Sequence, residues 1–229
     1  MSSFVLKIIA CISMFCDHFG DVFFEKLTFL NYIGRLAFPI FCFQIVQGYI
    51  HTHDIKRYIF RLSLFALISQ IPFMLFYHVV FDSFAINVIF TLLFGLFSIL
   101  IYDKYNKFVG VCSCLFLGTI AQVCQFDYGF FGVFIILMFY IFHNKKIAMS
   151  LMFALAVFIR YSIPLLQNGL SISYLFLNGK YSMLVYSTIF SIVPIIFYNG
   201  KKGKDAKYLF YIFYPFHLLI LSIISIIIL

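Results

Sequence analysis

Charged residues are scarce in this chain of 229 residues, and tryptophan is missing altogether. Asp, Glu, Lys and Arg together make up 10% of the sequence, whereas soluble domains usually carry about 25%. This scarcity excludes a soluble globular protein. Hydrophobic residues make up 64%, and they form repeated apolar runs of about 17 to 23 residues, long enough to cross a bilayer as helices. The composition therefore predicts a polytopic membrane protein.

The sequence also lacks the cysteine and histidine spacings of metal sites. Its six cysteines all lie in apolar segments without a CxxC or Cys/His pattern, so we interpret them as small hydrophobic residues. We therefore predict no metal ion. No small-residue cleavage site follows the apolar stretch after Lys7, so residues 4–20 are interpreted as a first membrane helix and not as a signal peptide.

Acidic residues are half as frequent as basic ones. The chain has 16 Lys and Arg against 8 Asp and Glu, a formal charge of +8, but no segment outside the apolar runs is large enough for a nucleic-acid-binding domain. We expect membrane lipids as partners and no nucleic acid. The cations are better explained as orientation signals, because Lys and Arg in short loops tend to stay on the cytoplasmic side.

Apolar runs bounded by charge clusters predict about nine membrane helices, within a range of eight to ten. Residues 164–180 are rich in amides and glycine and could form a loop, a re-entrant hairpin or a further partial span. No internal repeat divides the chain, so we expect an all-α protein with one helical bundle and a single domain over residues 1–229. The nine predicted spans are residues 4–20, 30–50, 58–80, 85–102, 108–125, 128–142, 147–163, 181–198 and 208–229.

Alternate connections between these spans differ in charge. The positive-inside rule assigns the basic set to the cytoplasm, which places the N-terminus inside and predicts a multi-pass protein of the inner (plasma) membrane. The opposite connections hold Asp21, Glu25, Lys26, Asp82, Asp127 and Lys180. The basic connections hold Lys56, Arg57 and Arg61, then Lys104 and Lys107, then Lys145 and Lys146, then Lys201, Lys202, Lys204 and Lys207.

Polar side chains inside the predicted spans converge on a similar depth. His18 lies eleven residues after Lys7, a climb of about 16 Å along a helix. Gln70 and His217 reach a similar height from the inner ends of their own helices. Since ionisable groups at membrane depth are costly unless paired or hydrated, we predict a hydrated chamber at this level. Its outer rim is predicted to include Asp17, Arg35 and Asn87.

Several of these residues also have a purely structural interpretation. Asp17 and Arg35 could form an ion pair without any further role. His18 favours a function, because an imidazole exchanges a proton near neutral pH and Asp17 is adjacent. His217 could instead bind a carbonyl freed by Pro215, which has no N–H to donate. Interhelical hydrogen bonds are the simplest interpretation of Gln44, Gln47, Gln70 and Asn87.

The cations of the first basic connection also have both a structural and a functional interpretation. Lys56, Arg57 and Arg61 are most simply anchors of the topology. Arg57 and Arg61 are four residues apart, however, and this spacing lets two guanidinium groups on one helix face bind one phosphate-bearing ligand. Lys7 could add to such a site.

Seven segments appear in an order that indicates a known family, and together they resemble the TraX family. They cover the chain from near its N-terminus to near its C-terminus. The segments are LKIIACISMFCDHFG (6–20), IGRLAFPIFCFQIVQGYIHT (33–52), RLSLFALISQIPF (61–73), INVIFTLLFG (86–95), DYGFFGV (127–133), YNGKKG (198–203) and KYLFYIFYPFHLLIL (207–221).

This resemblance implies acetyl transfer. The family is named for a protein that acetylates the N-terminus of F-type pilin, and it is grouped with integral-membrane acyltransferases that modify polysaccharides and lipids. That superfamily carries a basic residue upstream of a histidine on its first helix, which Lys7 and His18 match. Gln47 and Gln70 stand where many relatives are expected to have glutamate.

The resulting hypothesis is an acetyltransferase that uses cytoplasmic acetyl-CoA and modifies a hydroxyl or amine of a glycan, lipid or peptide. His18 is the predicted general base, and a covalent acetyl-histidine and direct transfer both fit. The alternative is a proton-coupled transporter that uses the same buried groups; an accessory membrane protein is a third. Catalytic residues are predicted to be His18, Asp17, Arg35 and His217, and donor-binding residues Lys7, Lys56, Arg57 and Arg61.

Overall fold

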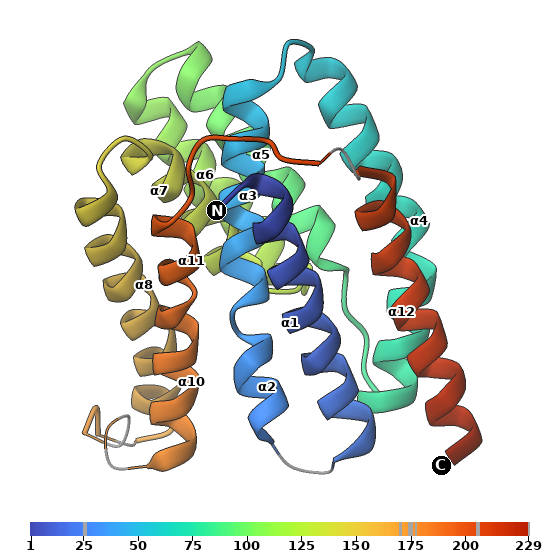
Figure 1. The fold of residues 1–229 in the computed structure, drawn as a ribbon. Coiled ribbons are helices and arrows are strands. Elements are labelled where there is room, and N and C mark those ends of the chain that lie inside the picture. The colour runs from blue at the N-terminus through green and yellow to red at the C-terminus, as the bar shows by residue number, and fades with distance from the viewer. Residues whose placement is uncertain (25–26, 170, 174–175, 177, 205–206, 229) are drawn as a thin grey trace. The chain divides into compact units, whose positions relative to one another are not determined.

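The computed structural model describes residues 1–24, 27–169, 171–173, 176, 178–204 and 207–228, with the side chains of 207, 208 and 228 left aside. Over these residues every regular element is a helix, and the sole β-type contact is an isolated bridge between Ile86 and Phe126. Figure 1 shows the helices. The all-α prediction is confirmed for the described part of the chain.

The helices belong to two compact units, which are described separately. Unit 1 combines residues 1–40 with 142–204, and unit 2 combines residues 41–141 with 205–229. The single domain predicted over residues 1–229 stays a prediction. Unit 1 contains α1 (Ser3–Phe23), α2 (Phe29–Gly34), α8 (Lys146–Gln167), α10 (Gly179–Phe190) and α11 (Ile192–Ile196). Unit 2 contains most of α3 (Ala37–His51), together with α4 (Ile55–Phe81), α5 (Val88–Lys104), α6 (Lys107–Val123), α7 (Gly129–Phe142) and α12 (Lys207–Ile228).

Within the described part of the chain, helices occur in each of the nine predicted segments, and six spans are long and apolar enough to cross a membrane. The helices Lys107–Val123 and Gly129–Phe142 are apolar but shorter. The protein is therefore a multi-pass membrane protein, while the count of nine spans stays a prediction. The six spans are Ser3–Phe23, Phe29–His51, Ile55–Phe81, Lys146–Gln167, Gly179–Ile196 and Leu209–Ile227.

The ambiguous segment 164–180 is divided between two helices and their connection. Residues 164–167 complete α8, in which Pro164 is an internal proline, and residues 179–180 begin α10. Asn178 caps α10, because its side chain accepts a hydrogen bond from the backbone N–H of Lys180 at 3.2 Å. Residues 170, 174, 175 and 177 lie outside the described part of the chain.

Unit 2 contains several packed helix pairs, and one of them, α4 with the start of α5, is joined by an amide centre formed by Gln70 and Asn87. In this unit α5 packs against α6 and α4, and α4 packs against α12. The side chain of Asn87 donates to the Ala66 carbonyl and to Gln70 Oε1, both at 2.8 Å. Gln70 donates through Nε2 to the Ala85 carbonyl at 3.1 Å. The structural interpretation of Gln70 and Asn87 as interhelical hydrogen-bonding residues is therefore confirmed.

The carboxylate of Asp103 links the ends of α3, α5 and α7 in unit 2. Asp103, near the end of α5, accepts hydrogen bonds from Tyr49 Oη of α3 at 2.7 Å and Tyr140 Oη of α7 at 2.9 Å. The rings of Tyr49 and Tyr140 meet edge to face at 5.5 Å. The charge of Asp103 is thus stabilised by two phenol donors while its side chain stays exposed.

We predict that Asn87→Ala destabilises the protein more than the capping variant Asn106→Ala. Both asparagines cap a helix through their side chains, and the loss of a cap costs about 1 kcal/mol. Only Asn87→Ala also leaves Gln70 Oε1 and the Ala66 carbonyl without that donor, which adds about 1–3 kcal/mol. Thermal unfolding in detergent measures the difference, and equal losses of stability would contradict the role of the amide centre.

Candidate functional site

The candidate site in unit 1 lies where α1 and α2 approach each other closely. Two motif glycines permit this approach. A Cβ atom built on Gly34 would lie 2.3 Å from the Cβ of Asp17, and one built on Gly20 would lie 3.0 Å from Asn31 Oδ1. These glycines stand in the segments DHFG and GRLAFPIF. The close packing of α1 and α2 therefore explains the glycine in each segment, whatever chemical role the neighbouring residues have.

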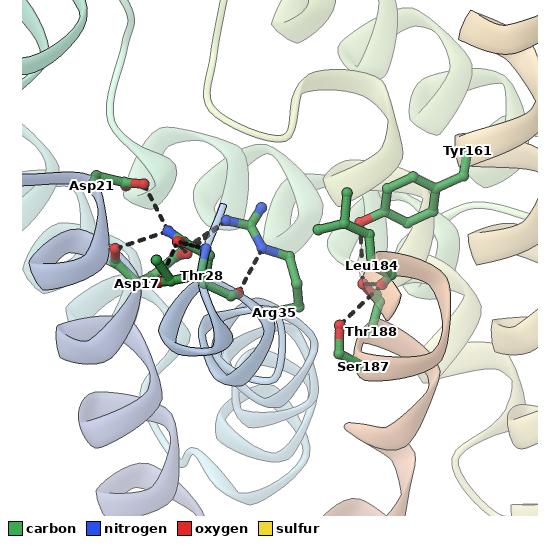
Figure 2. Close-up of polar contacts among 9 residues, drawn as sticks. Asp17, Asp21, Thr28, Arg35, Tyr161, Leu184, Ser187 and Thr188 are labelled. Atoms are coloured by element: carbon green, nitrogen blue, oxygen red, sulfur yellow. Dashed lines mark hydrogen bonds and ion pairs between the residues drawn. The ribbon is translucent and has the colours of Figure 1, made fainter. Parts of the chain in front are cut away.

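Asp17 and Arg35 form an ion pair across this contact. Arg35 Nη2 lies 2.7 Å from Asp17 Oδ1 and 2.8 Å from Oδ2, and the side chains are only 25% and 13% exposed. Figure 2 shows the guanidinium and the carboxylate directed at each other. An ion pair in an apolar surrounding depends on accurate geometry, because the charges have lost their water. The predicted pair is therefore confirmed as an interaction.

Asn31 connects this pair to the rest of the cluster. Its Nδ2 donates to Asp21 Oδ1 at 2.7 Å and to Asp17 Oδ1 at 3.3 Å, while its Oδ1 accepts from the N–H and hydroxyl of Thr28, both at 3.0 Å. The residue is 2% exposed. We call Asp17, Asp21, Thr28, Asn31 and Arg35 the α1–α2 cluster. Its buried amide orients the carboxylate that in turn holds Arg35.

A break in the second span places Arg35 at the end of α2. The helix stops after Gly34, and α3 starts at Ala37. Pro39 lies in the first turn of α3, where a proline is tolerated because its missing N–H would have no helical partner there. Arg35 Nε reaches the Asn31 carbonyl at 3.3 Å. The carboxylate of Asp17 and the backbone carbonyl of Asn31 thus both hold the guanidinium.

Beside the cluster, α10 packs on α2 and on α8. Tyr161 Oη of α8 and Thr188 Oγ1 of α10 lie 3.2 Å apart, and Thr188 also donates to the Leu184 carbonyl at 2.7 Å. Figure 2 shows this second set of polar contacts together with the cluster. Helices α8 and α10 are therefore linked by hydroxyl groups.

Lys7 and His18 belong to the same helix as Asp17. Both side chains are half-buried. Consecutive residues on an α-helix point about 100° apart, so His18 projects from a different side of α1 than Asp17, which faces α2. The contacts of Asp17 give it a role in positioning Arg35, and its predicted role of orienting His18 stays a prediction.

His217 lies in unit 2, on α12, and is buried. Its Nδ1 is 2.7 Å from the Phe213 carbonyl, whereas Pro215 removes the N–H that would bind the Tyr211 carbonyl. The ring therefore binds a different carbonyl from the one expected. Because a carbonyl only accepts hydrogen bonds, Nδ1 carries the proton, and in the neutral ring the lone pair belongs to Nε2. The predicted chamber that combines His18 with Gln70 and His217 spans both units and stays a prediction.

The basic residues at the start of α4 are exposed on unit 2. Arg57 Nε lies 2.9 Å from Asp54 Oδ2, with the arginine side chain 84% exposed, and Asp54 also caps the helix by accepting from the Arg57 N–H at 3.0 Å. An exposed pair of this kind adds little to stability. Lys56 and Arg61 are likewise exposed, so all three cations are accessible at one helix end.

Sequence reasoning missed Asn31, Thr28 and the place of Asp21 in the cluster. A signal was available, because Asp17 and Asp21 are four residues apart on one helix and Asn31 and Arg35 are four apart on the next. Within the described residues no group of three or more His, Cys, Asp or Glu side chains could hold a metal ion.

We predict that Gly34→Ala disrupts the α1–α2 cluster while Gly179→Ala is tolerated. The new methyl group at residue 34 would overlap Asp17 at 2.3 Å, whereas nothing lies within 4 Å of a Cβ at Gly179. Overpacking of this kind costs roughly 1–3 kcal/mol. Thermal unfolding of the two purified variants tests this, and a Gly34→Ala protein as stable as Gly179→Ala would show that the helices do not need the close contact.

Comparisons with known proteins agree with the motifs. The model of the family described as TraX protein matches residues 2–225. The probable fimbrial assembly protein FimC, serogroup H1, of Dichelobacter nodosus is 28% identical over 170 residues, which cover 68% of each chain. The uncharacterized protein RP591 of Rickettsia prowazekii is 28% identical over 161 residues, 67% of this chain and 61% of that protein. No solved structure matches. Because the family model covers nearly the whole chain, this protein belongs to the TraX family.

Proposed function

We propose that this protein is an integral-membrane acyltransferase that moves an acetyl group from acetyl-CoA to a hydroxyl or amine at or beyond the membrane. The observation that supports it best is the α1–α2 cluster. It holds a guanidinium inside a membrane span, on the helix pair that also carries His18. A fixed cation and a proton-exchanging group carried by the same helix pair are two groups that acyl transfer can use.

In the proposed reaction His18 is the general base. It takes the proton of the acceptor O–H or N–H as the acceptor oxygen or nitrogen attacks the thioester carbonyl carbon. The guanidinium of Arg35 stabilises the negative charge that develops on the carbonyl oxygen. The carbon–sulfur bond then breaks, the electron pair leaves with sulfur, and the imidazolium returns its proton to the CoA thiolate. His217 is proposed as a supporting base whose tautomer is set by the Phe213 carbonyl.

The proposed donor site uses cations that the structure leaves accessible. Lys56, Arg57 and Arg61 are exposed at the start of α4, and guanidinium groups bind phosphate oxygens well. Lys7 is proposed to add to this donor site. The name of the Dichelobacter nodosus relative, a probable fimbrial assembly protein, makes a fimbrial subunit the first acceptor class to test.

We also propose nine spans in the inner membrane with a cytoplasmic N-terminus, since the basic connections alternate with the less basic ones. On a cysteine-free background, a single cysteine at Lys104 or Lys145 should react with a membrane-impermeant maleimide only after the inner membrane is opened. A cysteine at Asp82 should react in intact spheroplasts. Reaction of all three positions from the same side would contradict this topology.

Acetyl-CoA binding tests the enzymatic proposal. We expect purified protein to be stabilised by acetyl-CoA, by about 2.7 kcal/mol at one hundred times the dissociation constant. Arg57→Ala/Arg61→Ala should lose this stabilisation, because the phosphates lose their partners. His18→Ala should keep the stabilisation but lose acetyl transfer to an added acceptor. Lys104→Ala/Lys107→Ala removes the same charge from another connection and is the matched control.

The same assay separates the enzyme from the transporter. Folded wild-type protein that is not stabilised by acetyl-CoA would contradict the acyltransferase proposal. Proton-linked flux in proteoliposomes that disappears in His18→Ala would then favour the transporter, because proton relays are the other common use of ionisable groups inside membranes.

A further inference from the structure

The C-terminal ends of α3, α5 and α7 meet at a second polar centre, in unit 2. Tyr49 of α3 and Tyr140 of α7 both donate to the carboxylate of Asp103 of α5, and Tyr102 packs edge to face on Tyr140 with ring centres 6.1 Å apart. We call these four residues the tyrosine–aspartate site. Tyr49, Asp103 and Tyr140 each lie within two residues of the end of their helix.

Three helix C-termini are an unfavourable place for a carboxylate. The last carbonyls of a helix have no partner within that helix, and its aligned peptide dipoles give this end a negative charge of about half an elementary charge. Three such ends come together at Asp103, so cations are favoured there and anions are not. The two phenol donors offset part of the cost. A cation bound to Asp103 would offset more of it.

Asp103 is accessible to a ligand. The residue is exposed, although each of its carboxylate oxygens accepts a hydrogen bond from a phenol. A carboxylate has about four acceptor positions, and among the described residues the phenols occupy two of them. The hydroxyl of Tyr49 donates to Asp103 and, like any phenol, can also accept. The site therefore offers several acceptors to a cation that carries hydrogen-bond donors.

The chemistry of the site favours an organic ammonium group over a metal ion. Tyr49 and Tyr102 both stand nearly perpendicular to the Tyr140 ring, at 82° and 85°, and aromatic rings attract organic ammonium groups. Hard metal ions prefer several oxygen ligands, whereas the described residues hold no group of three or more His, Cys, Asp or Glu side chains that could bind one. A primary ammonium has three N–H donors, which suit the carboxylate and phenol oxygens.

The position of the site points to a lipid headgroup as the source of the ammonium. Tyr49 lies two residues before the end of the span Phe29–His51, and tyrosines are enriched where spans meet the headgroup layer. Lys104 follows Asp103 directly and is exposed, with its Nζ 5.2 Å from the centre of the Tyr105 ring. Neighbouring side chains of opposite charge at one helix end complement a headgroup that carries both a phosphate and an ammonium group.

We propose that the tyrosine–aspartate site binds the primary ammonium of a phosphatidylethanolamine headgroup. Asp103 neutralises the ammonium, Tyr49 and Tyr140 hold the carboxylate in place, and Lys104 contacts the phosphate. A quaternary ammonium has no N–H to donate, so the site distinguishes phosphatidylethanolamine from phosphatidylcholine. A soluble primary amine has the same chemistry, and the test below separates the two sources. This inference does not depend on the proposed acyl transfer.

The experiment measures how short-chain lipids stabilise the full chain against thermal unfolding in detergent. The probes are dioctanoyl phosphatidylethanolamine, dioctanoyl phosphatidylcholine, and glycerophosphoethanolamine, which is the first headgroup without acyl chains. We expect the wild type to bind the ethanolamine lipid about tenfold more tightly than the choline lipid, because only the former makes charge-assisted hydrogen bonds. Asp103→Asn keeps the shape of the side chain but loses its charge, and it should bind both lipids equally.

Asp82→Asn is the matched control. It removes a carboxylate from another helix end of unit 2, the C-cap of α4, where φ is +46° and asparagine is well tolerated. This variant should keep the wild-type preference. A preference that persists in Asp103→Asn, or that is lost equally in Asp82→Asn, would overturn the proposal.

Tyr49→Phe tests the geometry without removing a charge. It keeps the ring but loses the hydroxyl that holds Asp103 and can accept from the ammonium, so the preference should fall about threefold. Thermal unfolding without lipid shows whether each variant is folded. A Tyr49→Phe protein with the full wild-type preference would overturn the arrangement of acceptors proposed for the site.

The soluble headgroup identifies the source of the ammonium. Glycerophosphoethanolamine that binds as tightly as the lipid assigns the site to a soluble primary amine, and binding of the lipid alone assigns it to the membrane. Equal binding of both lipids by folded wild-type protein overturns the proposal. Stabilisation by acetyl-CoA in Asp103→Asn should match the wild type, so failure of this inference would leave the proposed function standing.

Discussion

The ion pair between Asp17 and Arg35 is the interaction on which the arrangement of the first two spans depends. A guanidinium within an apolar helix pair has to be neutralised by a partner, and the carboxylate that neutralises it has to be close. Closeness requires Gly34, which leaves no Cβ to separate the helices at this point. Correct orientation requires Asn31, whose amide contacts both Asp17 and Asp21. One charge therefore accounts for both a glycine and a buried amide.

Hydropathy and charge predict the helices of this protein well, because each apolar run is bounded by residues that are costly to bury. Helix ends are equally well marked by polar caps such as Asp54, Asn87 and Asn106. The break between α2 and α3 was harder to foresee, since residues 29–51 form one apolar run. Its cause is local and lies in the proline of GRLAFPIF, whose position relative to Arg35 determines where the helix stops.

The candidate site was predicted in part. Asp17 and Arg35 could be paired from sequence because both are ionisable, lie in consecutive spans and have opposite charges. Asn31 could not be distinguished in the same way from other amides, since an asparagine in a span is more often an ordinary interhelical hydrogen bond. Gln70 shows that ordinary case: it both donates and accepts, which an ionised glutamate at this position could not do. The function of the amide depends on its neighbours, and these are set by the fold.

The division of unit 1 between two separate stretches of the chain also has a consequence for biosynthesis. Helix α1 is made first, but the carbonyls that accept from Ser3 and Phe4 are joined to the chain about two hundred residues later. Unit 1 as a whole combines residues 1–40 with residues 142–204, so it cannot be completed until most of unit 2 has been synthesised. During insertion the start of α1 must rely on water or lipid headgroups, and final closure of the unit is a late event in the assembly of the protein.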